Sequence, residues 1–445
     1  MSAPFVRPGR LVLWLLPLSF LAVFFFLPFV RILAATFSAS ALSGSNLRLA
    51  LDTLAFTVYQ AALSTALTLL IGLPAAYLFA RFSFPGRSLL HALTAAPFML
   101  PTVVVAAGFN ALLGSQGWIN LMLMRGFGLA SPPIVFVGTL GAILLAHVFY
   151  NTTIVIRLVG GALAGLDPRY GQAARSLGAD SRAVWQSVIL PLLRGPALAA
   201  ILLVFLFDFT SFGVILLLGG PSFATLEVQI YTEALYLLNL PVASLLALIQ
   251  LLCTIGFSVM YSRLALSAGV RAAPRSEAAN RQPADTPAQK RFVVAAVLVL
   301  SLLFVVPMLA LPLRSVSRLE ASRGQRGTVQ TGLTTDYYAE LFVNSRNSYF
   351  YVPPIRAATN SLLYAGTTVA LSLALGFPAA SALARPGRLE HILDPLLILP
   401  LGASAVTLGL GFIVTFGRWL AYPWMIPLAH TLVALPFVVR ALQPA

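Results

Sequence analysis

Residues 167–191 read DPRYGQAARSLGADSRAVWQSVILP and form a polar, helix-patterned segment between two apolar stretches of the chain. Asp167 suits the N-cap of a helix that starts at Pro168, because the N–H of a first helical residue has no partner within the helix. Gly178 suits the end of this helix, since glycine accepts a positive φ at no steric cost. The pattern predicts a short exposed helix that ends at a glycine corner.

A second helix is expected directly after this corner. Asp180 or Ser181 can cap it. Pro191 is expected to stop it, because proline lacks the N–H that a continuing helix needs. The whole segment is therefore predicted to be a helix, a glycine corner and a second helix, exposed at a membrane surface.

The spacing in this segment resembles the EAA signature of ABC importer permeases, which reads E-A-A, three residues, G, nine residues and I-x-L-P. Gln172 departs from the glutamate of that signature, and Val188 departs from the isoleucine. In that family the first short helix is the coupling helix, which fits a groove on a separate cytosolic ATPase subunit. The resemblance implies this role here, while an ordinary cytoplasmic loop with two capped helices is the alternative. The residues that carry the resemblance are Gln172, Ala173, Ala174, Gly178, Val188, Leu190 and Pro191.

The composition indicates an all-α polytopic membrane protein. Of the 445 residues, 59% are hydrophobic and 9% are charged, whereas about 25% are charged in a typical soluble domain. The net charge of +15 comes almost entirely from arginines that separate apolar runs, so no nucleic-acid partner is predicted. The single cysteine, Cys253, lies in an apolar run and the four histidines are scattered, so neither a metal nor a cofactor is predicted.

Apolar runs of about 20 residues predict about ten transmembrane helices. Six of them precede a polar linker and four follow it. The predicted spans are 11–36, 53–80, 88–113, 134–156, 196–218 and 241–261, followed by 292–313, 361–384, 392–416 and 422–439.

The positions of the arginines predict a multi-pass protein of the bacterial inner membrane with a cytoplasmic N-terminus, because cytoplasmic loops carry the excess of Lys and Arg. Arg81, Arg87, Arg157 and Arg194 then all lie at cytoplasmic ends of spans. The segment 315–356 disagrees with this orientation, since it carries several arginines on the side predicted to be outside.

Two copies of one unit flank the linker. The run Gly72-Leu73-Pro74-Ala75-Ala76 returns as Gly376-Phe377-Pro378-Ala379-Ala380, and the pair His147 and Arg157 returns as His430 and Arg440. Six spans separate the copies, so the two halves have parallel topology, which is consistent with the type I ABC importer fold that the resemblance implies. The predicted domains are a first permease half 1–263 with the coupling loop 161–194, a cytoplasmic linker 264–291, and a second half 292–445.

The second half is expected to be incomplete at its C-terminus. The coupling loop follows Arg157 by about ten residues in the first half, whereas the sequence ends five residues after Arg440 in the second. No second EAA-like segment follows Arg440, and the last two spans expected of the second half do not follow it either.

No enzymatic site is predicted. A P-loop needs a glycine-rich loop that ends in Gly-Lys-Ser/Thr, and the single lysine, Lys290, follows Ala288 and Gln289. ATP hydrolysis is therefore expected from a separate ABC ATPase dimer in the cytosol. The family also implies a periplasmic or lipid-anchored solute-binding protein, and membrane lipid as the surroundings.

Polar residues inside predicted spans are candidates for the translocation path. Asp208 is such an acid, and burying it costs about 3 kcal/mol on insertion scales, so it is expected to face protein or a water-filled path. A hydrogen bond to a neighbouring helix is the alternative role. The segment from Asp208 to Gly213 resembles the part of the fifth span that lines the route in the family. The path candidates are Asp208, Ser211, Phe212, Gly213, Asn110 and Asn151.

Three further segments bear on the solute. The segments 116–118, 145–151 and 219–233 are similar to those of thiamine-type permeases, while fused permeases for ferric iron share the architecture. Thiamine is therefore narrowly favoured over ferric iron.

Residues 118–124 are also expected to form a short amphipathic helix at the outer interface, where Trp118 would be an anchor or part of a dock for a binding protein.

Two other function classes compete with an importer permease. A secondary transporter driven by an ion gradient would be expected to carry several intramembrane acids or bases, and it gives no reason for the capped corner at Gly178. A non-transporting scaffold fits an incomplete second half, but it does not explain the repeat.

Overall fold

The computed structural model of the chain describes residues 8–37, 41–267, 281–318, 332–339, 341–343, 352–384 and 387–443. Within these ranges the structure is almost entirely helical, and the strands β1 (Ser317–Arg318) and β2 (Gly332–Leu333) form one short antiparallel pair. The described residues include 9 helices long and apolar enough to cross a membrane, or up to 10 if one bent pair counts as a span. The all-α polytopic prediction is confirmed.

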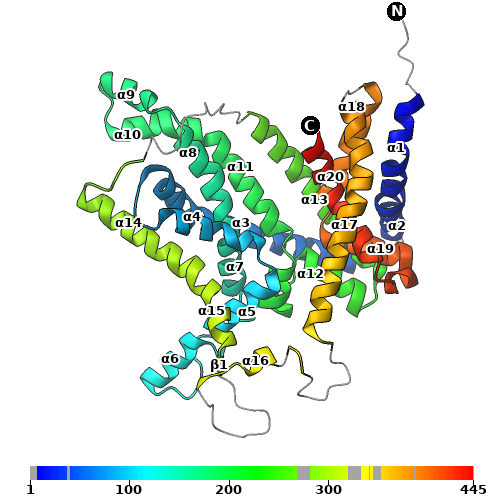
Figure 1. Cartoon of the computed structure of the whole chain (residues 1–445), viewed down its shortest axis with the longest axis horizontal. Helices are drawn as coiled ribbons and strands as arrows, with labels where there is room; N and C mark the ends of the chain where they lie inside the picture. Colours follow the sequence, from blue (N-terminus) through cyan, green and yellow to red (C-terminus); the bar gives the residue numbers. More distant parts are fainter. Residues whose placement is uncertain are drawn as a thin grey trace, which may run out of the picture. The chain divides into compact units, whose positions relative to one another are not determined.

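The chain divides into two compact units, and Figure 1 labels the helices that they contain. One unit, called unit A here, consists of residues 1–52, 229–255 and 336–445, and unit B consists of 53–228 and 256–335. The helices that begin before the linker are α1 (Pro8–Leu21), α2 (Leu27–Thr36), α3 (Gly44–Arg81), α4 (Arg87–Ala95), α5 (Thr102–Leu113), α6 (Trp118–Phe127), α7 (Leu140–Val155), α8 (Gly161–Gly165), α9 (Pro168–Ser176), α10 (Ser181–Val184), α11 (Leu190–Phe209), α12 (Leu226–Tyr231) and α13 (Leu240–Ser267). Those after it are α14 (Pro287–Leu300), α15 (Val306–Ser315), α16 (Asp336–Ala339), α17 (Pro354–Leu383), α18 (Arg388–Gly402), α19 (Ala405–Phe416) and α20 (Met425–Leu442).

Short π-helical and 3-10 turns interrupt or join several of these helices. The π turns are η1 (Ala22–Phe26), η3 (Ile156–Gly160), η4 (Trp185–Ile189), η5 (Ile215–Gly219), η7 (Thr232–Tyr236) and η9 (Ser301–Val305), and the 3-10 turns are η2 (Ala96–Met99), η6 (Pro221–Phe223) and η10 (Gly417–Ala421). Because a π turn bonds each N–H five residues back, it widens the helix without ending it.

The predicted span 88–113 is wrong as a single helix. The 3-10 turn η2 follows α4, Leu100 is extended, and α5 begins only after Pro101. Pro97 and Pro101 cause the break, since neither can donate the N–H that would carry a helix through this region. The segment long and apolar enough to span the membrane is instead Thr102–Phe127.

The predicted stop at Pro191 is also wrong. A continuous helical segment runs from Ser181 to Phe209 and contains this proline at the second residue of α11. The N–H of Leu190 bonds the carbonyl of Trp185 at the end of η4, so the helix has already changed its hydrogen-bond register just before the proline ring. The chain therefore passes Pro191 without leaving the helix. The predicted span 196–218 also divides, because this helix ends at Phe209 and a π turn begins only at Ile215.

An aromatic core holds unit B together. The ring of Phe149 on α7 lies 5.5 Å from that of Phe109 on α5 and 5.7 Å from that of Phe304 in η9, and all three side chains are buried. Since lipid is as apolar as these rings, their contribution comes from close packing and not from removal of water. A second apolar cluster in unit A joins Trp14 and Phe20 of α1 to α17 and α20.

Both units contain the same close helix contact. A Cβ placed on Gly72 of α3 would lie 2.7 Å from Cβ of Val155, at the C-terminus of α7. In unit A, a Cβ on Gly376 of α17 would lie 2.8 Å from Cγ1 of Val438 on α20. The repeat aligns Gly72 with Gly376 and Val155 with Val438, so each copy uses a glycine to let the same two helices approach.

Candidate functional site

The corner that follows the span Leu140–Gly165 of unit B is built by its own local sequence. Asp167 caps α9 by accepting a hydrogen bond from the N–H of Arg169 at 3.0 Å. Gly178 has φ 90°, which ends α9 in the left-handed region. Asp180, and not Ser181, caps α10 by accepting from the N–H of Ala183 at 2.7 Å. The predicted helix, glycine corner and helix are all present.

The corner presents an exposed surface. No residue of α9 is buried, and Leu177, which directly follows it, is 90% exposed. The tip of the corner is therefore open to contact by another protein, and Leu177 is a single exposed apolar residue and not a contiguous apolar patch. Gln172 and Ala173 are exposed on α9 and Ala174 is half-buried, whereas Val188 is half-buried in η4 and Leu190 and Pro191 are exposed on α11.

One continuous helix connects this corner to a buried polar cluster. The segment Ser181–Phe209 has 29 residues, which corresponds to about 43 Å at 1.5 Å per residue. Asp208 is the penultimate residue of this helix and is 0% exposed. A displacement of α10 would therefore be transmitted along one element to Asp208.

The helix is interrupted directly after Asp208. Residues 210–212 are not helical, and helical structure resumes at Gly213. Carbonyls at a helix end lack partners within the helix. Here the Nε2 group of the buried Gln60 on α3 donates to the carbonyl oxygen of Asp208 at 2.9 Å and also approaches that of Thr57 at 3.3 Å. The irregular backbone is thus supported by a side chain from another helix, as a membrane interior requires.

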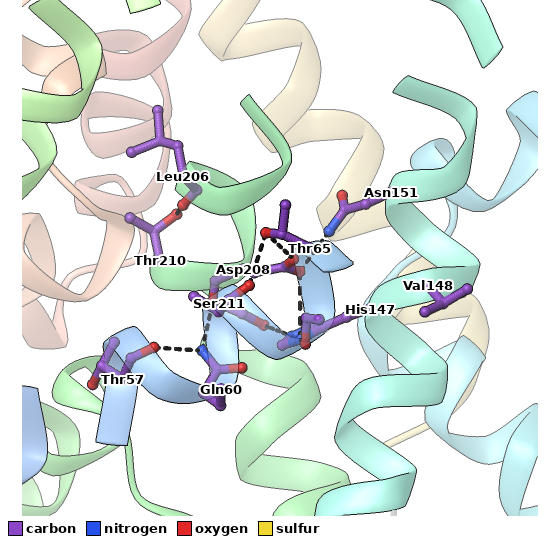
Figure 2. A network of polar contacts seen from close by, with 12 residues as sticks. Thr57, Gln60, Thr65, His147, Val148, Asn151, Leu206, Asp208, Thr210 and Ser211 are labelled. Carbon is purple, nitrogen blue, oxygen red and sulfur yellow. Dashed lines mark hydrogen bonds and ion pairs between the residues drawn. The ribbon is translucent and has the colours of Figure 1, made fainter. Parts of the chain in front are cut away.

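Asparagine is the closest partner of the Asp208 carboxyl group (Figure 2). Nδ2 of Asn151 on α7 donates to Oδ1 at 2.7 Å. The hydroxyl of Thr65 lies 3.5 Å from Oδ2, but it also lies 2.7 Å from the carbonyl of Ala61, which is the shorter bond. Asp208 therefore joins α3, α7 and α11, which is the alternative role that the sequence left open beside the translocation path.

His147 extends this cluster to the interruption. Its Nε2 lies 2.8 Å from Oγ of Ser211, and its Nδ1 lies 2.9 Å from Oγ of Ser64 and 3.4 Å from Oδ1 of Asp208. The order serine, histidine, aspartate resembles a hydrolase triad. However, Nδ1 is closer to Ser64 than to the carboxylate, and 3.4 Å is long for a hydrogen bond, so Asp208 does not hold the ring as a triad requires.

The second copy does not repeat this cluster. His430, the counterpart of His147, is exposed, whereas His147 is 2% exposed. The repeat also aligns three polar residues of the cluster with residues of other chemistry: Tyr364 has a hydroxyl in place of an amide, and Val369 and Ala434 have no polar side-chain atom. Gln60, Thr65 and Asn151 align with Tyr364, Val369 and Ala434. The polar cluster is therefore a feature of one copy.

The remaining path candidates lie at two places. Ser211, Phe212 and Gly213 lie at the interruption after α11, and a Cβ on Gly213 would overlap the hydroxyl of Thr102 at the start of α5. Asn110 is exposed and belongs to a different region, a cavity near the C-terminus of α5.

The sequence missed part of the neighbourhood of the corner. Residues 268–280 of the predicted linker lie outside the described part, but Gln282 pairs with the end of α3, accepting from the N–H of Ser83 at 3.1 Å and donating its own N–H to the carbonyl of Arg81 at 2.9 Å. A cavity of about 500 Å³ lies between this segment and the corner, with Arg81, Gln172 and Asp285 among its lining residues. The end of the predicted linker is therefore hydrogen-bonded to the end of α3, and its last residues, from Pro287 on, already belong to α14.

The sequence also missed an acid and three polar partners. Asp394 falls within the predicted span 392–416, and its carboxylate lies 2.9 Å from Nη2 of Arg440 in unit A. Gln60, Ser64 and Thr65 lie on α3 at helical spacing on one face, and this periodic polar face within an apolar span was the available signal.

A scan against models of known protein families finds no match. The chain is 29% identical over 397 residues to the thiamine transport system permease protein ThiP of Brucella abortus (strain 2308), a match that covers 88% of this chain and 68% of the relative. It is 30% identical over 288 residues to the putative 2-aminoethylphosphonate transport system permease protein PhnU of Salmonella paratyphi A, which covers 61% of this chain and 98% of the relative. A chain from the crystal structure of a bacterial alginate ABC transporter, in complex with alginate pentasaccharide-bound periplasmic protein, matches with a TM-score of 0.44 and 16% identity over 59% of this chain and 93% of its own length.

Proposed function

This chain belongs to the family of ABC importer permeases, and from that premise we propose that it conducts a small solute into the cytoplasm when a separate ATPase dimer hydrolyses ATP. As a permease subunit it is a multi-pass membrane protein and not itself the ATPase. The proposed orientation has the N-terminus and the corner at Gly178 on the cytoplasmic side, where a cytosolic ATPase can reach α9. A periplasmic or lipid-anchored solute-binding protein would then deliver solute on the opposite side.

The observation that carries this proposal is the corner together with its helix. The residues proposed to couple to the ATPase are Gln172, Ala173, Ala174, Gly178, Val188, Leu190 and Pro191. Movement of the ATPase pair would displace α9 and α10, and the helix from Ser181 to Phe209 would transmit that movement to Asp208 and the interruption behind it.

The interruption supplies a place where the path can change shape. A side-chain bond from Gln60 to the carbonyl of Asp208 supports its start in place of a continuous helical ladder, and the hydroxyl of Ser211 within it lies 2.8 Å from Nε2 of His147. Discontinuous spans commonly surround transport sites, because unwound backbone can bind or release groups that a regular helix cannot. Asp208, Ser211, Phe212, Gly213 and Asn151 are the residues that we propose for this part of the path, with Asn110 nearer the outer side.

Thiamine is the solute that we propose first, because the thiamine permease relative matches 88% of the chain. A 2-aminoethylphosphonate system is the second candidate, because its permease is matched over 98% of its own length. Ferric iron, which the sequence also leaves open, enters the test as a competitor.

The test is ATP-dependent uptake in proteoliposomes that contain the chain, its ATPase and its binding protein. We expect accumulation of radiolabelled thiamine that requires ATP and is reduced by excess unlabelled thiamine, but not by ferric citrate or 2-aminoethylphosphonate. Uptake driven by a proton or sodium gradient without ATP would refute the importer mechanism. Competition by 2-aminoethylphosphonate or by ferric iron alone would reassign the solute.

The coupling role has its own variant. Gly178→Val places a β-branched residue at φ 90°, which costs about 1–3 kcal/mol and shifts the corner. We expect at least a tenfold loss of ATP-dependent uptake. Gly161→Ala is the matched control, because Gly161 lies in the nearby α8 with open space around its Cα. Unchanged uptake with Gly178→Val would remove the coupling assignment.

A further inference from the structure

A cavity with a positively charged lining lies in unit B, along the C-terminal part of the span Leu140–Gly165. Its volume of about 290 Å³ is far more than the roughly 30 Å³ that one water molecule occupies in the liquid. Arg87, Arg157, Arg281 and His91 are the ionisable side chains of its lining, and no acid lines it among the described residues. A cleft lined by one sign of charge attracts the opposite sign, so this lining favours an anion.

Phe79 on α3 holds two of these side chains in place. Its carbonyl oxygen accepts a hydrogen bond from Nη2 of Arg87 at 2.8 Å, and Cζ of Arg87 lies 5.8 Å from the centre of its ring. The ring of His91 meets the ring of Phe79 nearly edge-on, with the two centroids 4.9 Å apart. One wall of the cavity is therefore fixed by defined contacts with α3.

Arg157 is the arginine of this lining that can bind an anion directly. It lies in η3, at the end of α7, and its side chain is exposed. Within the described part of the chain, its guanidinium group takes part in no hydrogen bond or ion pair. Arg87 and Arg281 already have other interactions, so they contribute charge to the lining and not the main grip.

The second copy supplies its own anion at the equivalent position. Arg440 is the counterpart of Arg157 in the repeat. Its Nη2 donates to the carboxylate of Asp394 at 2.9 Å, and its Nη1 donates to Oε1 of Gln443 at 2.7 Å. In unit A this arginine is therefore satisfied within the protein.

The first copy has neither of these partners. When the copies are aligned on the run Pro-Gly-Arg (85–87 and 386–388), Leu93 takes the place of the acid, and residues 88–101 contain no acid at all. Gly160 takes the place of the glutamine and lines the cavity. The first copy thus places the same arginine beside an open space, without an internal carboxylate.

We propose that this cavity binds a phosphate group, which takes the role that the Asp394 carboxylate has in the second copy. The planar guanidinium fork of Arg157 matches two phosphate oxygens. The charges of Arg87 and Arg281 add to the attraction. The site includes none of the residues proposed for the solute path or for coupling to the ATPase, so it goes beyond the proposed function.

Two sources can supply this group. In the proposed orientation this end of unit B lies at the cytoplasmic membrane surface, where both the headgroup of an anionic phospholipid and free phosphate reach it. Basic pockets between transmembrane helices on the cytoplasmic side bind anionic headgroups. The test therefore has one arm for each source.

The experiment uses the purified full chain in maltoside. One arm adds phosphatidylglycerol and counts bound lipid by native mass spectrometry, and the other titrates inorganic phosphate calorimetrically into delipidated protein. We expect saturable binding in at least one arm. It should weaken about tenfold or more in Arg157→Gln, because a charge-assisted hydrogen-bond pair is lost, and Arg157→Lys should restore part of it. Phosphatidylglycerol that phosphate does not displace identifies a lipid site, whereas phosphate binding without lipid binding identifies a site for the free anion.

The matched control is Arg194→Gln, which removes an exposed arginine of α11 that does not line the cavity. It should bind both probes like the unaltered chain. Equal binding by Arg157→Gln and the unaltered chain would overturn the proposal, as would binding in neither arm. An equal loss in Arg194→Gln would show only general charge attraction and would overturn it too. Matching unfolding midpoints for the two glutamine variants exclude a folding defect as the cause.

Binding of either probe needs neither ATP nor solute, so its outcome is separate from that of the proposed function. If the chain imports solute with ATP while Arg157→Gln binds both probes normally, the phosphate site is wrong and the importer stands. If binding depends on Arg157 but no ATP-dependent import occurs, the site stands and the proposed function fails.

Discussion

Removal of the Asn151 amide should destabilise the chain by an amount that the structure allows to be worked out. Asn151→Leu keeps the side-chain size but takes away the donor that lies 2.7 Å from Oδ1 of Asp208, whose side chain is 0% exposed. Leaving a buried acceptor without its hydrogen-bond partner costs about 1–3 kcal/mol. Interhelical bonds in membranes have a lower range, averaging about 0.6 kcal/mol with a maximum of about 1.7.

Two details decide between these ranges. The remaining contacts of the carboxyl group are poor substitutes, because His147 lies 3.4 Å away and the Thr65 hydroxyl lies 3.5 Å away with a closer partner in the carbonyl of Ala61. The Asn151 bond is also short and fully buried. We therefore expect a coupling energy between Asn151 and Asp208 of about 1.5 kcal/mol, at the upper end of the membrane range.

A double-mutant cycle measures this quantity. Asn151→Leu, Asp208→Leu and the double variant would be unfolded in mixed maltoside and dodecyl sulfate micelles, with helicity followed by circular dichroism. We expect each single variant to lower the free energy of unfolding, and the double variant to lower it by about 1.5 kcal/mol less than the sum, because removing both partners leaves fewer unsatisfied groups.

The control and the refuting result are specific. Asn110→Leu changes an exposed asparagine and should alter the free energy of unfolding by no more than about 0.5 kcal/mol. A coupling energy below about 0.5 kcal/mol for Asn151 and Asp208 would mean that their bond is no stronger than an average interhelical one. The claim that Asp208 anchors three helices would then be wrong.

Three further substitutions test the packing and the exposed corner. Gly213→Ala would place a Cβ 3.0 Å from Cβ of Thr102 and into its hydroxyl, so we expect a loss of about 1–3 kcal/mol in unfolding free energy, partly relieved by Thr102→Ala. Gly72→Ala would place its Cβ 2.7 Å from Cβ of Val155 and should lower the thermal midpoint, with recovery when Val155→Ala is added; no recovery would place the strain elsewhere. Leu177→Asp changes a side chain that is 90% exposed, so the unfolding free energy should stay within about 0.5 kcal/mol, while co-purification with the ATPase should fall; an unchanged complex would exclude Leu177 from the docking surface.

The corner could be predicted from the sequence because its causes are local. Asp167 and Asp180 each bond an N–H two or three residues ahead, and Gly178 adopts a backbone angle that its own chemistry permits. None of these features needs a distant part of the chain. The same reasoning failed at Pro191, because a π turn immediately before it had already changed the hydrogen-bond register.

The buried cluster could be predicted only in part. The cost of burying an acid in an apolar run identified Asp208 as a candidate. The side chain that bonds its backbone carbonyl is that of Gln60, which is 148 residues away in sequence. Hydropathy cannot show which helices meet, nor that the span predicted at 196–218 is interrupted at 210–212. The break at Pro101 was similarly hidden, since the surrounding run is apolar enough to read as one span.

The restriction of the polar cluster to one copy has a genetic consequence. Two similar copies of a DNA sequence can exchange segments by gene conversion. This exchange keeps the two copies similar to each other. Here such an exchange would give α17 the glutamine and threonine of α3, while α20 keeps Ala434 at the position that Asn151 occupies in the other copy. The reverse exchange would leave the Asp208 carboxyl group facing valine and alanine. Selection should therefore oppose recombination between the two copies, and each copy should tolerate a different set of substitutions at aligned positions.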